Sequence, residues 1–347
     1  MSTVTAYRLY LETDLNRVFA ASLRSIAAAE LDVILTNRLG APATEIASVD
    51  EGRTSYLRFE YPGDRMALVE HLAVLSATAA VFVEHSPTTL EPLPLEDELD
   101  FGTELVTIQR YKGKTSERLT RLMLNLALAS DSSKAPDHRS LLDPMCGRGT
   151  TLNWALLYGI RSTGLDVDRR ALDDHATFLQ QWAQSHRYPH KLQRYRKHDS
   201  ESRHFDFTVA TDRASLDRKT APDIRTLHAP ADSGSAPTGR HSMIVSDLPY
   251  GIQHQPRTSG EHSPTTIGEL VANVSSRWPS QLRTGGSVTL SWNVKSLGRR
   301  DMVDLLDAAG LTEVPTAGFE HRVDRTITRD VLVARRRPPR RRDAVSG

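Results

Sequence analysis

The sequence predicts an α/β protein: a small α+β unit at residues 1–95, then a doubly wound, mostly parallel sheet within residues 96–337. Two observations predict this fold class. From about residue 116 onward, short apolar strand patterns alternate with amphipathic helical patterns of 10–17 residues. The chain also has 347 residues, of which 39% are apolar and 25% charged, an ordinary balance for two globular domains.

The first 95 residues alternate between strand and helix patterns. Alternation of apolar and polar residues predicts strands at 7–12, 55–61 and 79–84, and helical spacing predicts helices at 17–35 and 65–75. Strand, helix, strand, helix, strand is typical of a ferredoxin-like fragment. The Pro-containing segment 88–100 is the expected linker.

The second part contains the predicted parallel sheet. Strands are expected at 104–110, 139–144, 161–168, 242–247, 287–293, 318–323 and 329–335, and helices at 116–130, 150–159, 170–186, 266–283 and 299–309. Residues 200–241 are rich in Ser, Asp, Pro and Gly, so we interpret them as an irregular insertion. The last two strands form a closing antiparallel hairpin.

Several classes of protein are disfavoured by composition. Cys146 is the single cysteine, which excludes an intramolecular disulfide and is typical of a reducing compartment. There is no CxxC and no HExxH, so we expect no metal site. No apolar run is long enough to cross a membrane, and the N-terminus lacks the pattern of a secretory signal, so we expect a cytoplasmic protein. The sequence leaves the oligomeric state undetermined.

Charge is concentrated at the C-terminus. The formal net charge is +1, yet six arginines occupy positions 335–337 and 340–342, so the rest of the chain is net acidic. Clustered arginines displace counterions from phosphates. We interpret 338–347 as a basic disordered tail, either a solvated end or a contact for a polyanion such as nucleic acid.

The segment LLDPMCGRGTTL, residues 141–152, joins a strand to a helix through a Gly-rich turn. Gly147 and Gly149 allow a ligand to approach the backbone, and the helix N-terminus near Thr150 favours negative groups. A dinucleotide fingerprint would place a third Gly at Leu152. The loop therefore favours a smaller, nucleoside ligand, and a tight structural turn is the alternative.

Acidic residues follow the next strands. Asp166, in GLDVD, lies about 20 residues after Asp143, where a carboxylate accepts hydrogen bonds from ribose hydroxyls. Asp168 is expected to cap the next helix. Asp199 is expected at the tip of the third strand, where it would receive an adenine amino group, or else in a plain loop.

The segment YKGKTSE, residues 111–117, invites comparison with a P-loop. A P-loop requires Gly at the position of Ile108, so ATP binding by this motif is excluded. Lys114 and Thr115 still precede a helix, and we expect them to wall the ligand pocket.

SDLPYG, residues 246–251, ends a predicted buried strand. Asp247 would lie at the sheet edge where such folds bind ligands, and Tyr250 offers a ring face to an unstacked base. A carboxylate there is suited to accept protons from an amine whose lone pair attacks. A β-turn containing Pro249 and Gly251 is the bland alternative.

Together these motifs resemble class I S-adenosylmethionine-dependent amino-methyltransferases. DPMCGRGT matches the cofactor loop, GLDVD the ribose acid and DLPYG the catalytic loop, within residues 139–335. GKT before a helix, and the closing FEHRVDRTITRDVLVARR, are similar to the THUMP-related tRNA guanine-N2 methyltransferases. The resemblance implies a Rossmann-like class I methyltransferase sheet with a closing antiparallel hairpin.

The resemblance also implies roles for individual residues. The expected contacts of S-adenosyl-L-methionine are Asp143, Met145, Cys146, Gly147, Gly149, Thr150, Asp166, Val167, Asp199, Lys114 and Thr115. The expected catalytic segment is Asp247, Leu248, Pro249 and Tyr250, where the commoner tetrapeptide has Pro in place of Leu248. The substrate would be an exocyclic amine, most simply guanine N2 in tRNA, so RNA is the expected partner. A complete THUMP domain is not recognisable in residues 1–95.

Other interpretations remain open at this point. The same loop suits adenine or cytosine in DNA, or a glutamine amide in a protein. A nucleic-acid-binding protein on a degenerate methyltransferase fold is the non-enzymatic alternative. HRYPHKLQRYRKH, residues 186–198, mixes basic residues with Tyr188 and Tyr195, a composition typical either of an RNA contact or of a solvated edge. Arg322, Arg325 and Arg329 in the closing hairpin are similar candidates.

Overall fold

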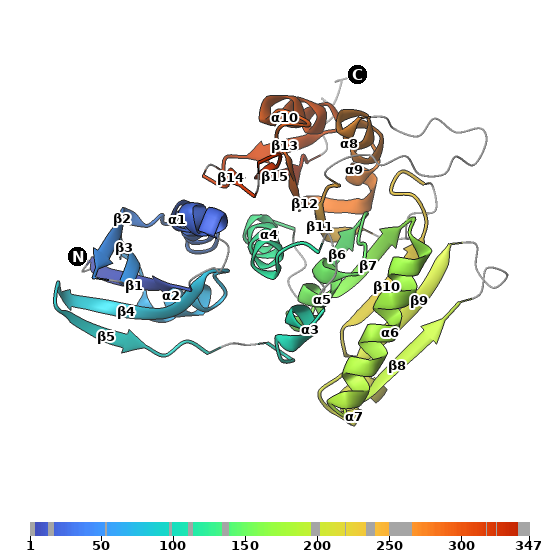
Figure 1. Cartoon of the computed structure of the whole chain (residues 1–347), viewed down its shortest axis with the longest axis horizontal. Coiled ribbons are helices and arrows are strands. Elements are labelled where there is room, and N and C mark those ends of the chain that lie inside the picture. The colour runs from blue at the N-terminus through green and yellow to red at the C-terminus, as the bar shows by residue number, and fades with distance from the viewer. Residues whose placement is uncertain are drawn as a thin grey trace, which may run out of the picture.

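Two β-sheets organise the chain in the computed structural model (Figure 1). The structure describes residues 4–12, 17–52, 54–96, 99–109, 114–133, 139–195, 202–218, 220–233, 240–249, 266–316, 318–323 and 325–338. Asp199, Tyr250 and most of the basic tail therefore lie outside the described residues.

The N-terminal sheet is antiparallel, in the order β2-β3-β1-β4-β5. Its elements are β1 (Thr5–Leu11), α1 (Arg17–Leu39), β2 (Thr44–Glu51), β3 (Thr54–Tyr61), α2 (Arg65–Ala73), β4 (Thr78–Ser86) and β5 (Thr89–Leu93). Tyr7, Leu9 and Leu11 alternate along β1 and are buried. The predicted ferredoxin-like arrangement is confirmed. The linker prediction is wrong over β5, and β2 was missed because none of its residues is buried.

The second sheet has the order β13-β15-β12-β11-β6-β7-β10-β9-β8, and β14 pairs with β15. Its strands are β6 (Ser140–Asp143), β7 (Arg161–Asp166), β8 (His190–Arg194), β9 (Arg203–Val209), β10 (Asp223–His228), β11 (His241–Asp247), β12 (Leu282–Asn293), β13 (Leu311–Val314), β14 (His321–Arg322) and β15 (Thr328–Arg336). The five strands β12, β11, β6, β7 and β10 are parallel, and β15 is antiparallel to β12 and β13. This is the predicted class I methyltransferase sheet with its antiparallel closure.

Helices cover both faces of this sheet. They are α3 (Glu104–Thr107), α4 (Glu117–Ser130), α5 (Thr150–Leu157), α6 (Arg169–Ser185), α7 (Arg213–Arg218), α8 (Ile267–Ser275), α9 (Trp278–Gln281) and α10 (Arg299–Ala308). Along β11, Met243 and Val245 join the apolar cluster that contains α4 and α5. Ile244 joins the opposite cluster, which contains α8 and α10. The strand is therefore buried on both sides, as a central parallel strand requires.

Three predictions about elements are wrong. Residues 200–241 are not an irregular insertion, because β9, α7 and β10 lie there and Phe205, Phe207 and Val209 alternate into the core. The expected strand at 104–110 begins as the short helix α3, whose Leu105 and Val106 are buried. The expected helix at 266–283 is two helices, α8 and α9, and β12 already begins at Leu282.

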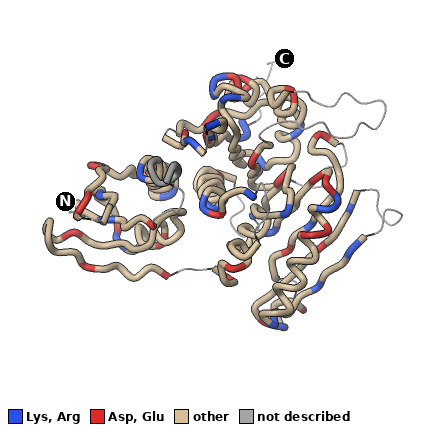
Figure 2. Tube along the Cα trace, viewed as in Figure 1, with Lys and Arg blue, Asp and Glu red and all other residues tan. Residues whose placement is uncertain are grey.

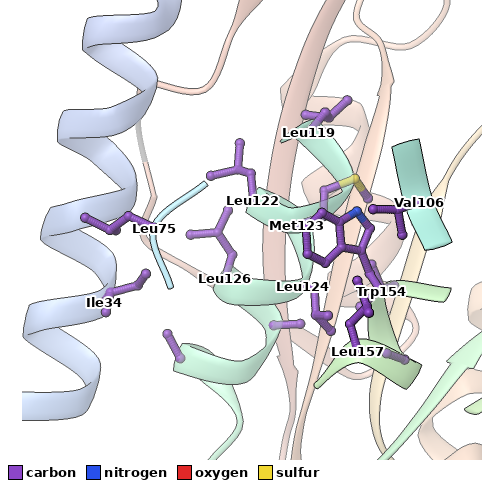
Figure 3. Packing of buried hydrophobic residues seen from close by; sticks show 14 of the residues in the cluster. Ile34, Leu75, Val106, Leu119, Leu122, Met123, Leu124, Leu126, Trp154 and Leu157 are labelled. Atoms are coloured by element: carbon purple, nitrogen blue, oxygen red, sulfur yellow. The ribbon is translucent and has the colours of Figure 1, made fainter. Parts of the chain in front are cut away.

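The N-terminal unit packs on α4 of the second sheet. Figure 3 shows Ile34 of α1 and Leu75 in the contact between α1 and α4, opposite Leu122 and Leu126 of α4, and all four belong to one apolar cluster. A buried polar group lies in the same contact. Glu30 is fully buried, and its carboxylate accepts hydrogen bonds from the Asn125 amide (2.7 Å), the Ser76 backbone N–H (3.1 Å) and the Ser76 hydroxyl (2.6 Å).

Glu30→Ala is expected to lower the free energy of unfolding by about 3 kcal/mol. The substitution leaves the Ser76 N–H and the Asn125 amide without their buried acceptor, and each orphaned group costs about 1–3 kcal/mol. Urea denaturation measures the loss. Asp32→Ala, at an exposed position of the same helix, is the matched control and should change stability by less than about 0.5 kcal/mol. Equal effects of the two substitutions would contradict the assignment.

Candidate active site

Four adjacent parallel strands end in polar residues at one edge of the sheet. β11 ends at Asp247, β6 at Asp143, β7 at Asp166 and β10 at His228. Because parallel strands share the direction of their carboxyl ends, these residues lie along a single edge. Ligands of open α/β sheets bind at such an edge, so the structure brings together three of the predicted acidic residues.

Asp143 connects β6, the loop and β11. Its side chain is 2% exposed, and Oδ1 accepts hydrogen bonds from the Met145 N–H (3.1 Å) and the Ser246 hydroxyl (2.9 Å). The loop then turns through Gly149, whose φ of 80° is left-handed, and α5 starts at Thr150. Through these hydrogen bonds Asp143 fixes the first turn of the Gly-rich loop.

Asp166 holds the same loop from the neighbouring strand. Its Oδ2 accepts a hydrogen bond from the Gly147 N–H (2.6 Å), and its Oδ1 accepts one from the Asp168 N–H (2.8 Å). The Cys146 N–H bonds to the Leu165 carbonyl (2.9 Å), and its sulfur lies against Gly164. Asp168 caps α6, as predicted, by accepting from the Arg170 and Ala171 N–H groups. The loop is therefore rigidly seated on β7.

Burial raises the pKa of Asp143 to about 7, opposed by its hydrogen bonds to Met145 and Ser246. The folded protein therefore holds this proton between about pH 4 and 7, where the unfolded chain has lost it. The contribution to stability is largest below pH 4 and is lost as the pH rises toward 7.

Asp143→Asn should remove this dependence of stability on pH. The stability difference between variant and wild type should change by about 4 kcal/mol between pH 4 and 8, at 1.4 kcal/mol per pKa unit. Urea denaturation at both pH values tests it, and a constant difference would contradict it.

Asp199 lies outside the described residues, so its expected place at the tip of the third strand stays a prediction. The strand next to β7 in the sheet is β10, and it ends at His228. The His228 Nε2 donates to the Val167 carbonyl (3.0 Å), and the Ala229 N–H bonds to the Asp166 carbonyl (3.0 Å). Val167 is 37% exposed beside them. Sequence reasoning missed His228 because its strand was hidden in the segment interpreted as irregular.

Lys114 and Thr115 reach different partners. The Lys114 ammonium donates to the carbonyls of Val106 (2.6 Å) and Gln109 (2.7 Å) and also pairs with Glu117. Its charge therefore stabilises the turn before α4. The Thr115 hydroxyl donates to Asp247 Oδ2 (2.6 Å). The prediction that these residues contact a cofactor stays a prediction.

The SDLPYG segment begins at the end of β11 and leaves the sheet next to β12. Leu248 is 1% exposed in the apolar cluster with α8, and its N–H bonds to the Ser291 carbonyl (2.8 Å), so it anchors the loop. Pro249 is exposed. Arg329 on β15 is 5% exposed and places Nη2 3.5 Å from Asp247 Oδ2. Arg329 was one candidate for an RNA contact, and its burial beside Asp247 argues against that interpretation.

The basic segment that includes the edge strand β8 is only partly available to contact RNA. Figure 2 shows basic positions along the edge strand β8, which carries Lys191 and Arg194. Tyr188, however, packs edge-on against Phe101, with ring centroids 4.9 Å apart. Arg203 lies over the Tyr195 ring at 4.7 Å. The two tyrosines therefore already have packing partners, which weakens their interpretation as base-stacking residues.

The described residues contain neither a metal-binding cluster nor a membrane-spanning helix. Among them, no group of three or more His, Cys, Asp or Glu side chains is placed to hold a metal ion. In the same part of the chain, no helix combines the length and the apolar composition that a membrane crossing requires.

Comparison with known proteins gives related findings. No protein-family model matches the chain. Over 181 residues, 52% of the chain, it is 29% identical to the tRNA (guanine(10)-N2)-dimethyltransferase of Methanothermobacter thermautotrophicus. The match spans 39% of that relative's length.

Solved structures align at lower identity. TrmN from Thermus thermophilus aligns with 84% of this chain and 59% of its own, at 16% identity and a TM-score of 0.39. The T. thermophilus 16S rRNA N2 methyltransferase RsmC, in complex with AdoMet and guanosine, aligns with 84% of this chain and 58% of its own, at 15% identity and a TM-score of 0.37. The resemblance that the three loops predicted is confirmed by the sequence match: the chain is similar to a tRNA guanine-N2 methyltransferase.

Proposed function

We propose that this protein is an S-adenosylmethionine-dependent RNA methyltransferase that methylates an exocyclic amine, guanine N2 in tRNA. One observation carries the proposal: Asp143, Asp166 and Asp247 end three adjacent parallel strands. Two of them hold the Gly-rich loop, and the third, Asp247, has a buried carboxylate oxygen without a hydrogen-bond partner among the described residues.

The residues at this edge fit the cofactor. A Cβ added at Gly147 would meet nothing within 4 Å, so a ligand can approach the backbone there. The Asp166 carboxylate accepts backbone hydrogen bonds from Gly147, Val167 and Asp168, and it keeps acceptor capacity for a ribose hydroxyl. Val167 offers an exposed apolar side chain to a flat base. Gly147, Asp166 and Val167 would therefore hold the nucleoside part.

When bound, S-adenosylmethionine supplies an electrophilic methyl group. The task of the protein is then to align and desolvate the attacking amine. Asp247 is only 15% exposed, and a carboxylate there accepts an N–H of the amine, so the nitrogen lone pair is held toward the methyl group. After transfer, the same carboxylate is placed to accept the proton that the nitrogen loses.

RNA as the substrate class rests on the likeness to a tRNA guanine-N2 methyltransferase and on the ferredoxin-like unit that packs against α4. The chain spans about two fifths of that relative, so the whole activity is proposed rather than transferred. DNA bases and a protein glutamine amide present similar planar amines and are tested as alternative substrates.

Mass spectrometry of nucleosides tests the proposal. The protein is incubated with deuterated-methyl S-adenosylmethionine and, separately, with total tRNA, ribosomal RNA, genomic DNA and a protein extract. Labelled N2-methylguanosine from tRNA is the expected result. Label only in DNA or protein would replace the substrate. No label in any sample, although the cofactor binds, would overturn the proposed activity.

A further inference from the structure

Asp247 has two carboxylate oxygens in different surroundings. Oδ2 receives the Thr115 hydroxyl at 2.6 Å and faces Arg329 Nη2 at 3.5 Å. Oδ1 is buried and has no hydrogen-bond partner among the described residues. A buried carboxylate oxygen without a donor is costly, so its natural partner is a donor that arrives with the substrate.

The two donors come from segments that are far apart in the sequence. Thr115 lies two residues before the start of α4, and Arg329 lies on the antiparallel strand β15. Both approach Asp247 on the face of the sheet that α4 covers, because Met243 and Val245 of β11 and Val331 of β15 pack in the cluster of α4. The carboxylate is thus held from two sides through a single oxygen.

We propose that Thr115 is a positioning residue for Asp247. Its hydroxyl fixes Oδ2 so that Oδ1 is presented to the substrate amine, with Arg329 supplying the opposing positive charge. This inference rests on the proposed methyl transfer for its kinetic consequence. It also changes the role expected for Thr115 from a cofactor contact to a partner of the catalytic carboxylate.

Arg329 acts on the Asp247 carboxylate mainly through its positive charge and contributes little to the orientation of the carboxylate. A separation of 3.5 Å is long for a hydrogen bond, whereas the 2.6 Å contact of Thr115 is short and strong. Burial lowers the pKa of Arg329, and the charge of Asp247 opposes that shift. The orientation of the carboxylate therefore depends mainly on Thr115.

A set of three variants tests the positioning. Thr115→Val keeps the shape of the side chain and removes the hydroxyl, and Thr115→Ser keeps the hydroxyl. Thr289→Val is the matched control, because the Thr289 hydroxyl is buried on the neighbouring strand β12 without a hydrogen-bond partner among the described residues. Thr115→Val should lower kcat for tRNA methylation about 10- to 100-fold, with KM for tRNA and Kd for S-adenosylmethionine within about twofold of wild type. Thr115→Ser and Thr289→Val should stay within about threefold of the wild-type kcat.

Crystal structures of the same variants give a readout independent of turnover. The Asp247 carboxylate should keep its wild-type orientation in Thr115→Ser and rotate or adopt several orientations in Thr115→Val. An unchanged orientation in Thr115→Val, or a Thr115→Ser variant as impaired as Thr115→Val, would overturn the proposal. Wild-type protein that transfers no methyl group to RNA would overturn the proposed function instead, while the orientation of Asp247 would still decide the role of Thr115.

Discussion

Gly149→Ala is expected to destabilise the protein by about 2–5 kcal/mol. Gly149 has a φ of 80°, where a residue with a Cβ loses about 1–2 kcal/mol. An added Cβ would also lie 2.0 Å from the ring of His175, which is fully buried and hydrogen-bonded to Asn153 at 2.8 Å. Because the ring has no exposed side toward which to move, overpacking adds about 1–3 kcal/mol.

Gly147→Ala is the matched comparison for the same loop. Gly147 also has a positive φ, 51°, but a Cβ there would meet no protein atom within 4 Å. The variant should lose only the backbone term of about 1–2 kcal/mol. Its Cβ would instead occupy the space proposed for the cofactor, so its affinity for S-adenosylmethionine should fall at least about tenfold.

Urea denaturation and calorimetric titration of the cofactor separate the two glycines. Gly149→Ala should be the less stable variant, and Gly147→Ala should show the loss of affinity without a comparable loss of stability. Equal destabilisation would mean that His175 does not support the loop. Unchanged affinity in Gly147→Ala would place the cofactor elsewhere.

The sequence alone was sufficient to predict the acidic residues at the ends of the strands. Asp143, Asp166 and Asp247 each follow an apolar run, and a parallel sheet necessarily brings such residues to one edge. Two of the strands that were not predicted, β2 and β10, show why others were missed. β2 buries no residue, and β10 lies between segments rich in Ser, Asp and Pro, so neither strand was predicted and His228 at the end of β10 was missed.

The partners of the site residues were beyond pattern reasoning. Thr115 lies 132 positions from Asp247 and Arg329 lies 82 positions from it, and no periodicity links them. Their contact depends on how α4 and β15 pack against the sheet. Hydrogen bonds between side chains distant in sequence follow from tertiary packing, so a single sequence identifies the carboxylate but not the groups that orient it.

Asp247→Asn is expected to lower the rate of methyl transfer at least about 100-fold, within the range typical of a lost catalytic proton-transfer group. The geometry gives the reason. Thr115 and Arg329 both donate toward Oδ2, so the carbonyl oxygen of Asn is drawn to that side. Its amide nitrogen then takes the place of Oδ1 and presents a donor to an amine that also donates. The variant would repel the group that Asp247 orients.

Single-turnover methylation of tRNA measures this loss, with thermal denaturation and cofactor titration on the same samples. The thermal stability and the affinity for S-adenosylmethionine should remain near wild type, because Asn fills the same volume as Asp. The Gly-rich loop is held by Asp143 and Asp166, not by Asp247. Asp168→Asn is the control: it is another acid beside the site, and Asn caps a helix as well as Asp does. A rate above one tenth of wild type in Asp247→Asn, or a loss of cofactor affinity comparable to the loss of rate, would give Asp247 a structural role. Since Oδ1 has no hydrogen-bond partner among the described residues, a structural role through hydrogen bonding would depend on Oδ2, and the Thr115 variants would then reproduce it.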